Sequence, residues 1–129
     1  MAPHRYDPDR SPDPKWWLAL DEHERMDLVE EYHRKARVRL PNARVHAAMH
    51  MIIENQVALG SEIPVAATLA RLIRQGLDRH EALHAIASVL TAHIHSRLQD
   101  ELPPDDDPNV AYFAELAELT PQSWRMRFR

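Results

Sequence analysis

The sequence contains no cysteine, only two glycines among its 129 residues, and no long apolar run. Without thiols the chain cannot form disulfides, thiolate metal sites, iron–sulfur clusters or cysteine nucleophiles, so nitrogen and oxygen must supply any metal ligands. Two glycines are too few for a phosphate-binding loop, a dinucleotide fingerprint or a set of tight hairpins. No stretch approaches the roughly 18 apolar residues that a membrane span requires. We therefore expect a soluble, cytoplasmic protein that does not associate with membranes.

Positive charge is also scarce. The chain has 16 basic and 20 acidic residues, which gives a net charge of −4. A general nucleic-acid-binding protein needs surplus positive charge to displace counterions from the phosphate backbone. The charge balance therefore disfavours nucleic acid as the main partner.

Ten prolines divide the chain into segments. Four of them lie before residue 15, and the others stand at positions 41, 64, 103, 104, 108 and 121. Because proline lacks an amide donor and clashes with the preceding turn, it favours helix starts and connections over helix interiors. We expect a flexible N-terminal tail over 1–14, a helical bundle domain over 15–120 and a C-terminal tail over 121–129.

The proline-free stretches carry apolar residues at helical spacing, which predicts helices over about 16–39, 42–60, 64–76 and 78–99 and a shorter one after the linker at 100–108. Asn42 is placed to cap the second helix, and Asp78 with Glu81 has the spacing of a capping box. Both glycines follow predicted helix ends, where a left-handed cap is needed. No alternation typical of strands occurs. The sequence thus predicts an all-α bundle of four or five helices.

Nine histidines are the most unusual feature of the composition. Four of them form two pairs with i, i+4 spacing, His46 with His50 and His80 with His84. Residues four apart lie one helical turn above each other, so each pair can present two imidazoles to one point. Each pair borders the predicted apolar face of its helix. On the first of these helices, the predicted inward face consists of Val45, Met49, Ile52 and Ile53.

Two glutamates extend these pairs into a candidate metal site. If the two helices are neighbours, four imidazoles and two carboxylates would face one another across a narrow gap. Imidazole and carboxylate together suit Zn²⁺, Fe²⁺ or Mn²⁺, and helical bundles build such sites between facing helices. We therefore expect a divalent transition metal, with one or two ions, and a symmetric homodimer could supply a second set of ligands. The predicted ligands are His46, His50, Glu54, His80, Glu81 and His84.

The segment from His80 to His84 also matches the H-E-x-x-H pattern of zinc metallopeptidases. In that reading the two histidines hold zinc and Glu81 acts as the catalytic general base. A peptidase also needs a third ligand and a substrate-aligning strand, and the chain predicts no strand. Glu81 has an alternative role in the capping box with Asp78. Both roles of Glu81 stay open at this point.

Other polar residues are assigned with less specific roles. Asn55 and Gln56 follow Glu54 on the same helix, where they would either hold a metal ligand in place or form a buried hydrogen bond between helices. His93 and His95 point to different faces, so at most one of them could join the site. We expect the remaining histidines, His4, His23 and His33, to face solvent.

Three short motifs resemble those of a family of small bacterial proteins catalogued as domain of unknown function 1841. They are Leu-Pro-Asn, His-x-x-x-His-x-x-x-Glu-Asn-Gln and Arg-His-Glu-x-x-His-Ala. The similarity covers Leu40 to about His95. It supports the histidines and glutamates of the candidate site, together with Gln56, as a functional set, and it implies no particular reaction.

Two alternatives to a metal-binding protein remain. The segment between Glu31 and Glu54 contains five basic residues and no acidic one, and the helices joined at Gly76 resemble a helix-turn-helix, which together suggest a nucleic-acid-binding module. A non-catalytic interaction module is the other alternative, in which the apolar residues of the C-terminal segment, Trp124 and Phe128 among them, dock on a partner. Such a module would keep its fold after metal chelation.

Overall fold

The computed structural model describes residues 5–37, 42–99 and 107–128, and no strand occurs in these ranges. The predicted all-α class is therefore confirmed. The first predicted helix is interrupted at residues 20–21, and residues 121–128 are helical, so the described residues form more helices than the four or five predicted. They are α1 (Pro14–Ala19), α2 (Glu22–Lys35), α3 (Ala43–Ala58), α4 (Val65–Arg74), α5 (Arg79–Leu98), α6 (Pro108–Glu118) and α7 (Pro121–Phe128), with a 3₁₀ turn, η1 (Gly60–Glu62), after α3.

Short polar side chains and the two glycines fix the ends of α3, α4 and α5 as predicted. Asn42 accepts a hydrogen bond from the backbone of the first turn of α3. Asp78 and Glu81 form a reciprocal capping box at the start of α5, with bonds of 2.7 and 3.1 Å. Gly60 and Gly76 have φ angles of 62° and 113°, which residues with a side chain rarely adopt. The two helices that carry the histidine pairs thus begin where the local sequence specifies.

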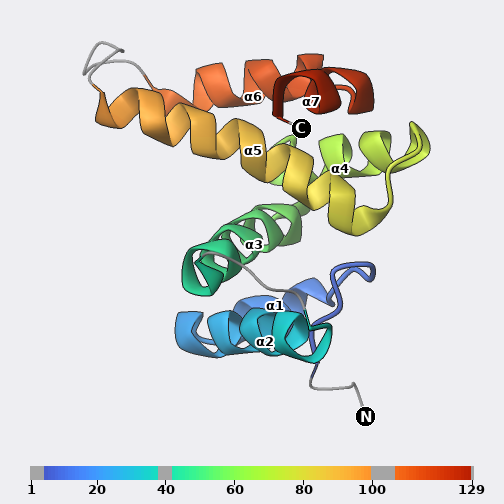
Figure 1. Ribbon diagram of the computed structural model, residues 1–129, viewed down its shortest axis with the longest axis vertical. Coiled ribbons are helices and arrows are strands. Elements are labelled where there is room, and N and C mark those ends of the chain that lie inside the picture. Colours follow the sequence, from blue (N-terminus) through green and yellow to red (C-terminus); the bar gives the residue numbers. More distant parts are fainter. Residues whose placement is uncertain (1–4, 38–41, 100–106, 129) are drawn as a thin grey trace.

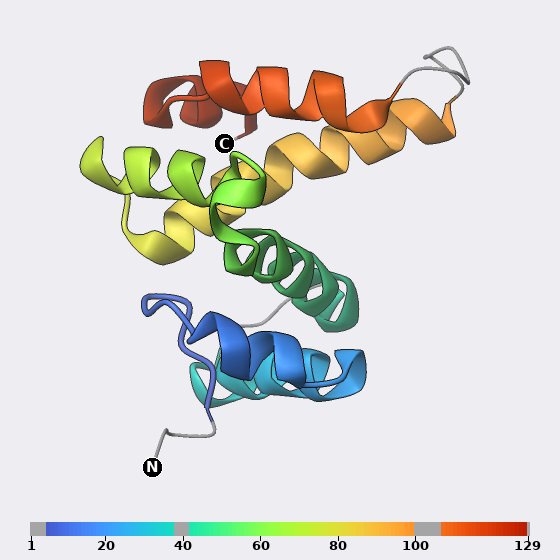
Figure 2. The same cartoon turned by 180° about the vertical axis from the view of Figure 1, so that it is seen from behind.

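Helix α3 lies between the two halves of the molecule (Figures 1 and 2). Helices α1 and α2 pack on one side of it, and α4 and α5 pack on the other. Helices α6 and α7 in turn cover α5. One apolar cluster, which includes Trp17 and Met51, joins α1 and α2 to α3, and a second, which includes Ile53 and Ile86, joins α3 to the remaining helices. Burial of these two clusters brings α2, α3 and α5 together.

The buried face of α3 differs in part from the predicted one. Ile53 is buried as predicted, whereas Val45 is 55% exposed. The other buried positions are Ala47, His50, Met51 and Glu54, which follow i, i+3, i+4, i+7 spacing. Two polar side chains therefore lie on the inward face. They tolerate burial because both find polar partners on other elements.

Both ends of the described chain pack on the helices. Tyr6 is 4% exposed and lies 5.7 Å from Trp17, ring centre to ring centre, and Pro8 is buried. We predicted a flexible tail over 1–14, whereas Tyr6 and Pro8 of this stretch are buried against the helices. Residues 1–4 lie outside the described residues. Trp124 of α7 is buried in the second apolar cluster. None of the helices in the described ranges is long and apolar enough to cross a membrane.

Candidate metal centre

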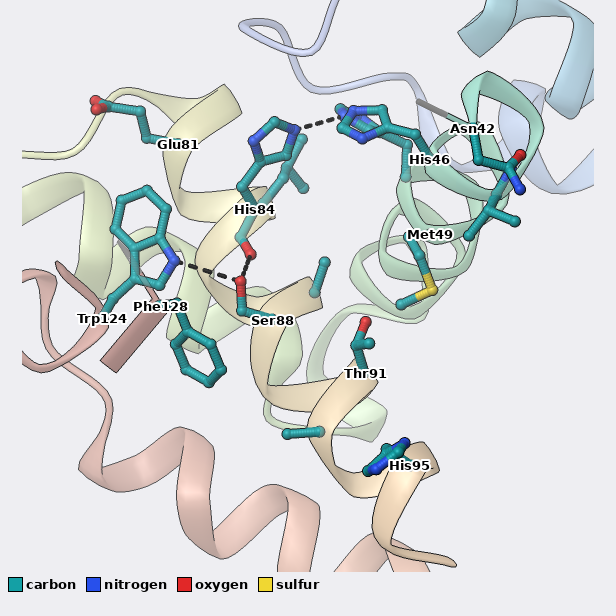
Figure 3. Close-up of a pocket in the computed structure, with 15 residues that line it drawn as sticks. Asn42, His46, Met49, Glu81, His84, Ser88, Thr91, His95, Trp124 and Phe128 are labelled. Atoms are coloured by element: carbon teal, nitrogen blue, oxygen red, sulfur yellow. Dashed lines mark hydrogen bonds between the residues drawn. The ribbon is translucent and has the colours of Figure 1, made fainter. Parts of the chain in front are cut away.

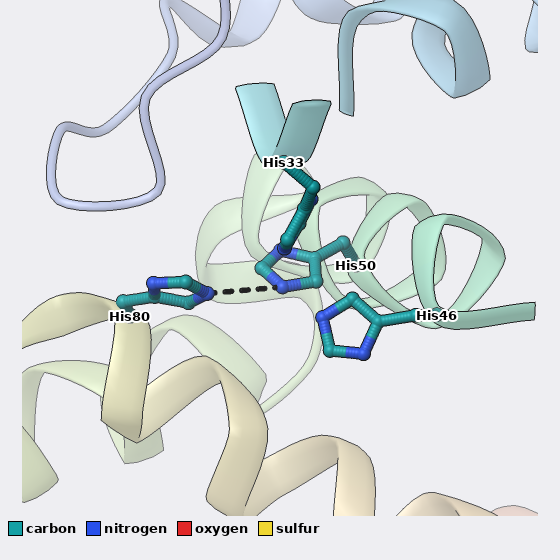
Figure 4. A group of neighbouring side chains, drawn as sticks. All are labelled: His33, His46, His50 and His80. Atoms are coloured by element: carbon teal, nitrogen blue, oxygen red, sulfur yellow. Dashed lines mark hydrogen bonds between the residues drawn. The ribbon is translucent and has the colours of Figure 1, made fainter. Parts of the chain in front are cut away.

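Five histidine side chains from three helices meet where α2, α3 and α5 come together. We call them the histidine cluster: His33 of α2, His46 and His50 of α3, and His80 and His84 of α5. Figure 4 shows four of these rings gathered around a common point. One ring nitrogen from each of these four, those of His33, His46, His50 and His80, lies within 4.8 Å of the others. A group of this kind could hold a metal ion.

The burial of His33 contradicts the prediction that it faces solvent, because its side chain is 4% exposed. Its Nδ1 lies 2.9 Å from the carbonyl oxygen of Val29. A carbonyl can only accept, so Nδ1 carries the proton and the lone pair is on Nε2. The signal was available in the sequence, since His33 follows the buried residues Met26 and Val29 at seven and four positions. Of the other two histidines predicted to face solvent, His23 is exposed and position 4 lies outside the described residues.

A chain of hydrogen bonds fixes the ring of His50. Its Nδ1 lies 3.1 Å from the hydroxyl of Tyr6, and that hydroxyl donates to Oε2 of Glu54 at 2.6 Å. Burial and the Glu54 carboxylate raise the pKa of Tyr6 well above its usual value, so the hydroxyl keeps its proton. Because this proton is given to Glu54, the hydroxyl oxygen accepts from Nδ1, and the lone pair of His50 is on Nε2.

The lone pair of His50 points into the cluster. Its Nε2 lies 3.2 Å from Nε2 of His80 and 3.0 Å from Nε2 of His84. The Nε2 atoms of His33 and His46 are buried and form no hydrogen bond within the described part of the chain. Buried nitrogens without a partner are costly, and a cation bound to their lone pairs would remove that cost. The cluster therefore fits a metal ion.

The surroundings of His46, His50, His80 and His84 favour the neutral form of these four imidazoles. Burial, assisted by the neighbouring imidazoles, lowers the pKa of His46 and of His84 to about 4. The same two causes lower the pKa of His50 further, and burial also lowers that of His80. Neutral imidazole is the form that binds metals. At neutral pH the nitrogens are therefore available without loss of a proton.

We expect the metal-free protein to lose stability as the pH falls from 6.5, the ordinary pKa of histidine, to about 4, the pKa of His46 and His84 in the folded state. Between these values the unfolded chain binds more protons than the folded one, so acid favours unfolding. Above pH 6.5 these histidines add no pH dependence. Urea unfolding with a chelator present measures the effect, and the double variant His46→Ala/His84→Ala should show a shallower slope. An unfolding free energy that stays constant over this window would contradict the expectation.

Glu54, a predicted ligand, is engaged by other side chains through both carboxylate oxygens. Oε2 accepts from Tyr6 and from Nη1 of Arg79 at 2.7 Å, and Oε1 accepts from Nη2 of Arg79 at 2.8 Å. Arg79 is 7% exposed and also donates to the carbonyl oxygen of Pro8 at 3.0 Å. The structure thus places Glu54 behind His50, where it holds the residue that orients the ring.

Glu81, predicted as a ligand or catalytic base, lies in the capping box of α5. Its Oε1 accepts from the backbone N–H of Asp78 at 3.1 Å. In Figure 3 its carboxylate points away from the rings of His84 and His46. The two histidines of the H-E-x-x-H pattern therefore join the cluster without the glutamate between them. The described residues also contain no strand that could align a peptide substrate.

Asn55 and Gln56 form hydrogen bonds between helices, which is one of the two roles predicted for them. Oδ1 of Asn55 accepts from Nε1 of Trp17 at 2.8 Å and from Nη1 of Arg25 at 2.9 Å. Oε1 of Gln56 accepts from the hydroxyl of Tyr112 at 2.6 Å. These bonds tie α1, α2 and α6 to α3. The amides thus help to position α3, and the structure gives them no contact with the histidine cluster.

The remaining histidines of α5 lie apart from the cluster. Nε2 of His93 is 3.6 Å from a carboxylate oxygen of Glu115, and its ring lies 6.2 Å from that of Tyr112 on α6. His95 is exposed. Neither belongs to the group of ring nitrogens that meets between α2, α3 and α5.

Some of the basic residues that suggested nucleic-acid binding are paired with acids. A guanidinium nitrogen of Arg44 lies 3.1 Å from the carboxylate of Glu30, and the ammonium of Lys35 lies 2.8 Å from that of Glu31. These pairs reduce the positive potential of the segment. Arg39 of the same segment lies outside the described residues.

Tyr6 and Arg79 are site residues that the sequence does not reveal. Tyr6 is 44 residues from His50 and lies in a proline-rich stretch, so no helical spacing connects them. Arg79 lies 25 residues from Glu54, so no helical spacing connects these two either. A single signal was available: Arg79 is the arginine that precedes His80 in the word Arg-His-Glu.

A pocket of about 1040 Å³ opens beside the cluster, between α3, α5 and α7 (Figure 3). Three of its lining residues belong to the cluster: His46, His50 and His84. Apolar side chains form much of the remaining wall, among them Val45, Met49, Leu83, Ala87 and Phe128. No lysine or arginine of the described chain lines it. One side of the histidine cluster therefore faces a space that a small molecule could enter.

The family comparison agrees with the resemblance noted above. A family model described as "Domain of unknown function (DUF1841)" matches residues 13–117. Comparisons with curated proteins and with solved structures give no match. The matched segment contains all five histidines of the cluster and both members of the Glu54–Arg79 pair, whereas Tyr6 precedes it. Because the match spans more than half of the chain, the chain belongs to the DUF1841 family.

Proposed function

We propose that the protein binds one divalent transition metal ion through the imidazoles of four residues: His33, His46, His50 and His80. The observation that carries this proposal is that one ring nitrogen from each of the four histidines lies close to the others. In two of these rings the proton is on the other nitrogen, Nδ1. His33 and His50 each donate from Nδ1, to a carbonyl and to a tyrosine hydroxyl, so the Nε2 lone pair of each faces the cluster. A hydrogen bond from the second ring nitrogen is how proteins commonly orient a histidine toward a metal.

The donor set favours zinc over manganese. Glu54 is paired with Arg79 and Glu81 caps α5, so the proposed ligands include no carboxylate. Imidazole suits zinc, iron, copper and nickel, whereas manganese prefers oxygen ligands. The bridging carboxylates on which dinuclear centres of helical bundles rely are missing as well. We therefore propose a single ion, with zinc as the first candidate and Fe²⁺ as the second.

His84 gives the proposed centre a side that faces the pocket. Its Nε2 lies 3.0 Å from that of His50, and it lines the pocket, which His33 and His80 do not. A bound zinc ion would supply Lewis acidity at this place. His84 is positioned beside the four proposed ligands, where it could accept a proton from a molecule that enters the pocket.

A competition titration tests the proposal. Untagged protein is stripped of metal with a chelator and titrated at neutral pH with zinc and, separately, with manganese. We expect one zinc ion per chain, and manganese binding weaker by at least about 100-fold, because the ligands are all nitrogen and manganese is lowest in the affinity order. Failure to bind zinc, or equal affinity for both metals, would contradict the proposal.

Replacing Tyr6 with phenylalanine is expected to weaken zinc binding by about 10- to 100-fold, the usual effect of losing the partner that orients a metal ligand. Phenylalanine keeps the packing on Trp17 but leaves Nδ1 of His50 without its acceptor. Competition with a chromogenic chelator measures the change.

The matched control for this variant is Tyr32→Phe. The ring of Tyr32 also lies close to the cluster, 5.8 Å from that of His80, but its hydroxyl forms no hydrogen bond to the described residues. We expect this variant to bind zinc like the unmodified protein. If Tyr6→Phe also bound zinc with unchanged affinity, the chain from Arg79 to His50 would have no role in metal binding.

A further inference from the structure

We propose that the pocket beside the histidine cluster binds a small apolar molecule with an anionic head group, a carboxylate, which the charge of the metal ion attracts. This inference rests on the proposed function, because the ion is what would attract the head group. It specifies the class of ligand that the centre takes.

The walls of the pocket suit an apolar body. Val45 and Met49 of α3, Leu83 and Ala87 of α5, and Phe128 of α7 all line it. Figure 3 labels Met49 and Phe128 among them. Val45 is 55% exposed even though it lies next to the buried part of α3. An apolar ligand would cover this surface and gain free energy from its removal from water.

Two polar groups in the wall, the Ser88 hydroxyl and the Trp124 indole, are already hydrogen-bonded within the protein. Ser88 Oγ donates to the carbonyl oxygen of His84 at 2.8 Å and accepts from Nε1 of Trp124 at 3.4 Å (Figure 3). A ligand body that passes these groups therefore needs no hydrogen-bonding atoms of its own. This favours a hydrocarbon chain or an unsubstituted ring over a sugar, a nucleotide or a peptide.

The charge of the occupied centre favours an anionic head group. Of the two nearby glutamates, Glu54 is paired with Arg79, and Glu81, which also lines the pocket, accepts from the backbone of Asp78. A divalent ion held there would keep its two positive charges without a carboxylate ligand to offset them. No lysine or arginine of the described residues lines the pocket, so the ion would be its main positive charge. Charges in such partly buried surroundings attract an anion more strongly than they do in water.

The volume is sufficient for this ligand. The pocket holds about 1040 Å³, at the upper end of the roughly 300–1,000 Å³ typical of small-molecule sites. A carboxylate with a chain of about ten carbons would therefore fit without a change in the helices. We take decanoate as the probe, because it combines the head group with an apolar body.

Calorimetric titration of decanoate into the zinc-loaded protein tests the inference. We expect one decanoate per chain, bound at least about tenfold more tightly, or about 1.4 kcal/mol, than to the metal-free protein, since the head group loses its partner there. Acetate, which has the head group without the chain, and decanol, which has the chain without the charge, should each bind at least about tenfold more weakly than decanoate.

A variant that fills the pocket separates the apolar wall from the metal centre. Thr91 is exposed and lines the pocket two turns after His84, so Thr91→Trp should block decanoate while zinc content stays unchanged. The matched control is Ala117→Trp, at an exposed position of α6 that does not line the pocket. This control should bind both zinc and decanoate normally.

The outcomes distinguish this inference from the proposed function. If zinc binds but decanoate binds equally well without it, or if Thr91→Trp has no effect, the inference is overturned and the metal centre stands. If decanoate fails to bind and sedimentation shows a dimer that Thr91→Trp dissociates, the pocket is covered by a second copy of the chain. If zinc itself does not bind, the proposed function fails first.

Discussion

Replacing His50 with alanine is expected to reduce zinc affinity by at least about 100-fold, since loss of a partner that merely orients a ligand already costs about 10- to 100-fold. His50 is central to the cluster because its Nε2 is the atom that lies 3.0 and 3.2 Å from the neighbouring ring nitrogens. Its removal also releases the Tyr6 hydroxyl. Zinc content after dialysis and competition titration measure the loss.

A second variant separates loss of a metal ligand from a disturbance of the fold in His50→Ala. His46→Ala removes a predicted ligand whose Nε2 forms no hydrogen bond in the described part of the chain, so the fold should lose little. We expect it to weaken zinc binding as well. His23→Ala, at an exposed position of α2, is the control that should bind zinc normally. Unchanged zinc affinity in both cluster variants would contradict a role of these histidines in metal binding.

Replacing Arg79 with leucine is expected to destabilise the protein by about 3–5 kcal/mol, the usual cost of breaking a buried ion pair by removing one partner. Glu54 is 1% exposed and would be left in the interior without the cation that pairs with it. The carbonyl oxygen of Pro8 would lose its donor as well. Urea unfolding with a chelator present measures the change without a contribution from bound metal.

Two further variants isolate the buried charge as the cause. Arg79→Leu/Glu54→Leu removes both charges and should recover much of the lost stability, because no uncompensated carboxylate remains. Lys35→Ala breaks an exposed ion pair with Glu31 and should leave the free energy of unfolding nearly unchanged. If Arg79→Leu proved as mild as Lys35→Ala, Arg79 would not be essential for holding Glu54.

The ends of α3, α4 and α5 could be predicted because local chemistry determines them. The Asn42 cap, the capping box of Asp78 with Glu81, and the two glycines at positive φ each involve residues within one turn. The i, i+4 pairs were also readable, and all four of their histidines reach the cluster. Interactions between residues one turn apart can be recognised from a short stretch of the sequence.

The inward face of a helix was harder to predict, because it depends on which elements pack against it. On α3 the structure buries Ile53 of the predicted apolar face but leaves Val45 exposed, and it buries His50 and Glu54 as well. The burial of His33 on α2 was missed for the same reason. The buried face of α2 contains Met26, Val29 and His33. In each case a polar side chain was assumed to avoid burial, and partners from other helices made its burial favourable.

Contacts between distant segments could not be predicted from spacing. The Tyr6 hydroxyl reaches His50 and Glu54 from a stretch whose prolines suggested a tail, and Arg79 reaches back 25 residues to Glu54. Such contacts exist only once the two apolar clusters have brought the helices together. They change the chemistry of the site, because Glu54 becomes part of the support of His50 instead of a ligand.

X-ray absorption at the zinc edge of the zinc-loaded, untagged protein tests the central claim most directly. The account predicts nitrogen ligands at about 2.0 Å, the usual zinc–imidazole distance, and outer scattering from four imidazoles. The same spectrum in His50→Ala loaded with zinc would contradict it. So would a first shell of oxygen ligands without imidazole scattering, because the zinc would then lie outside the histidine cluster.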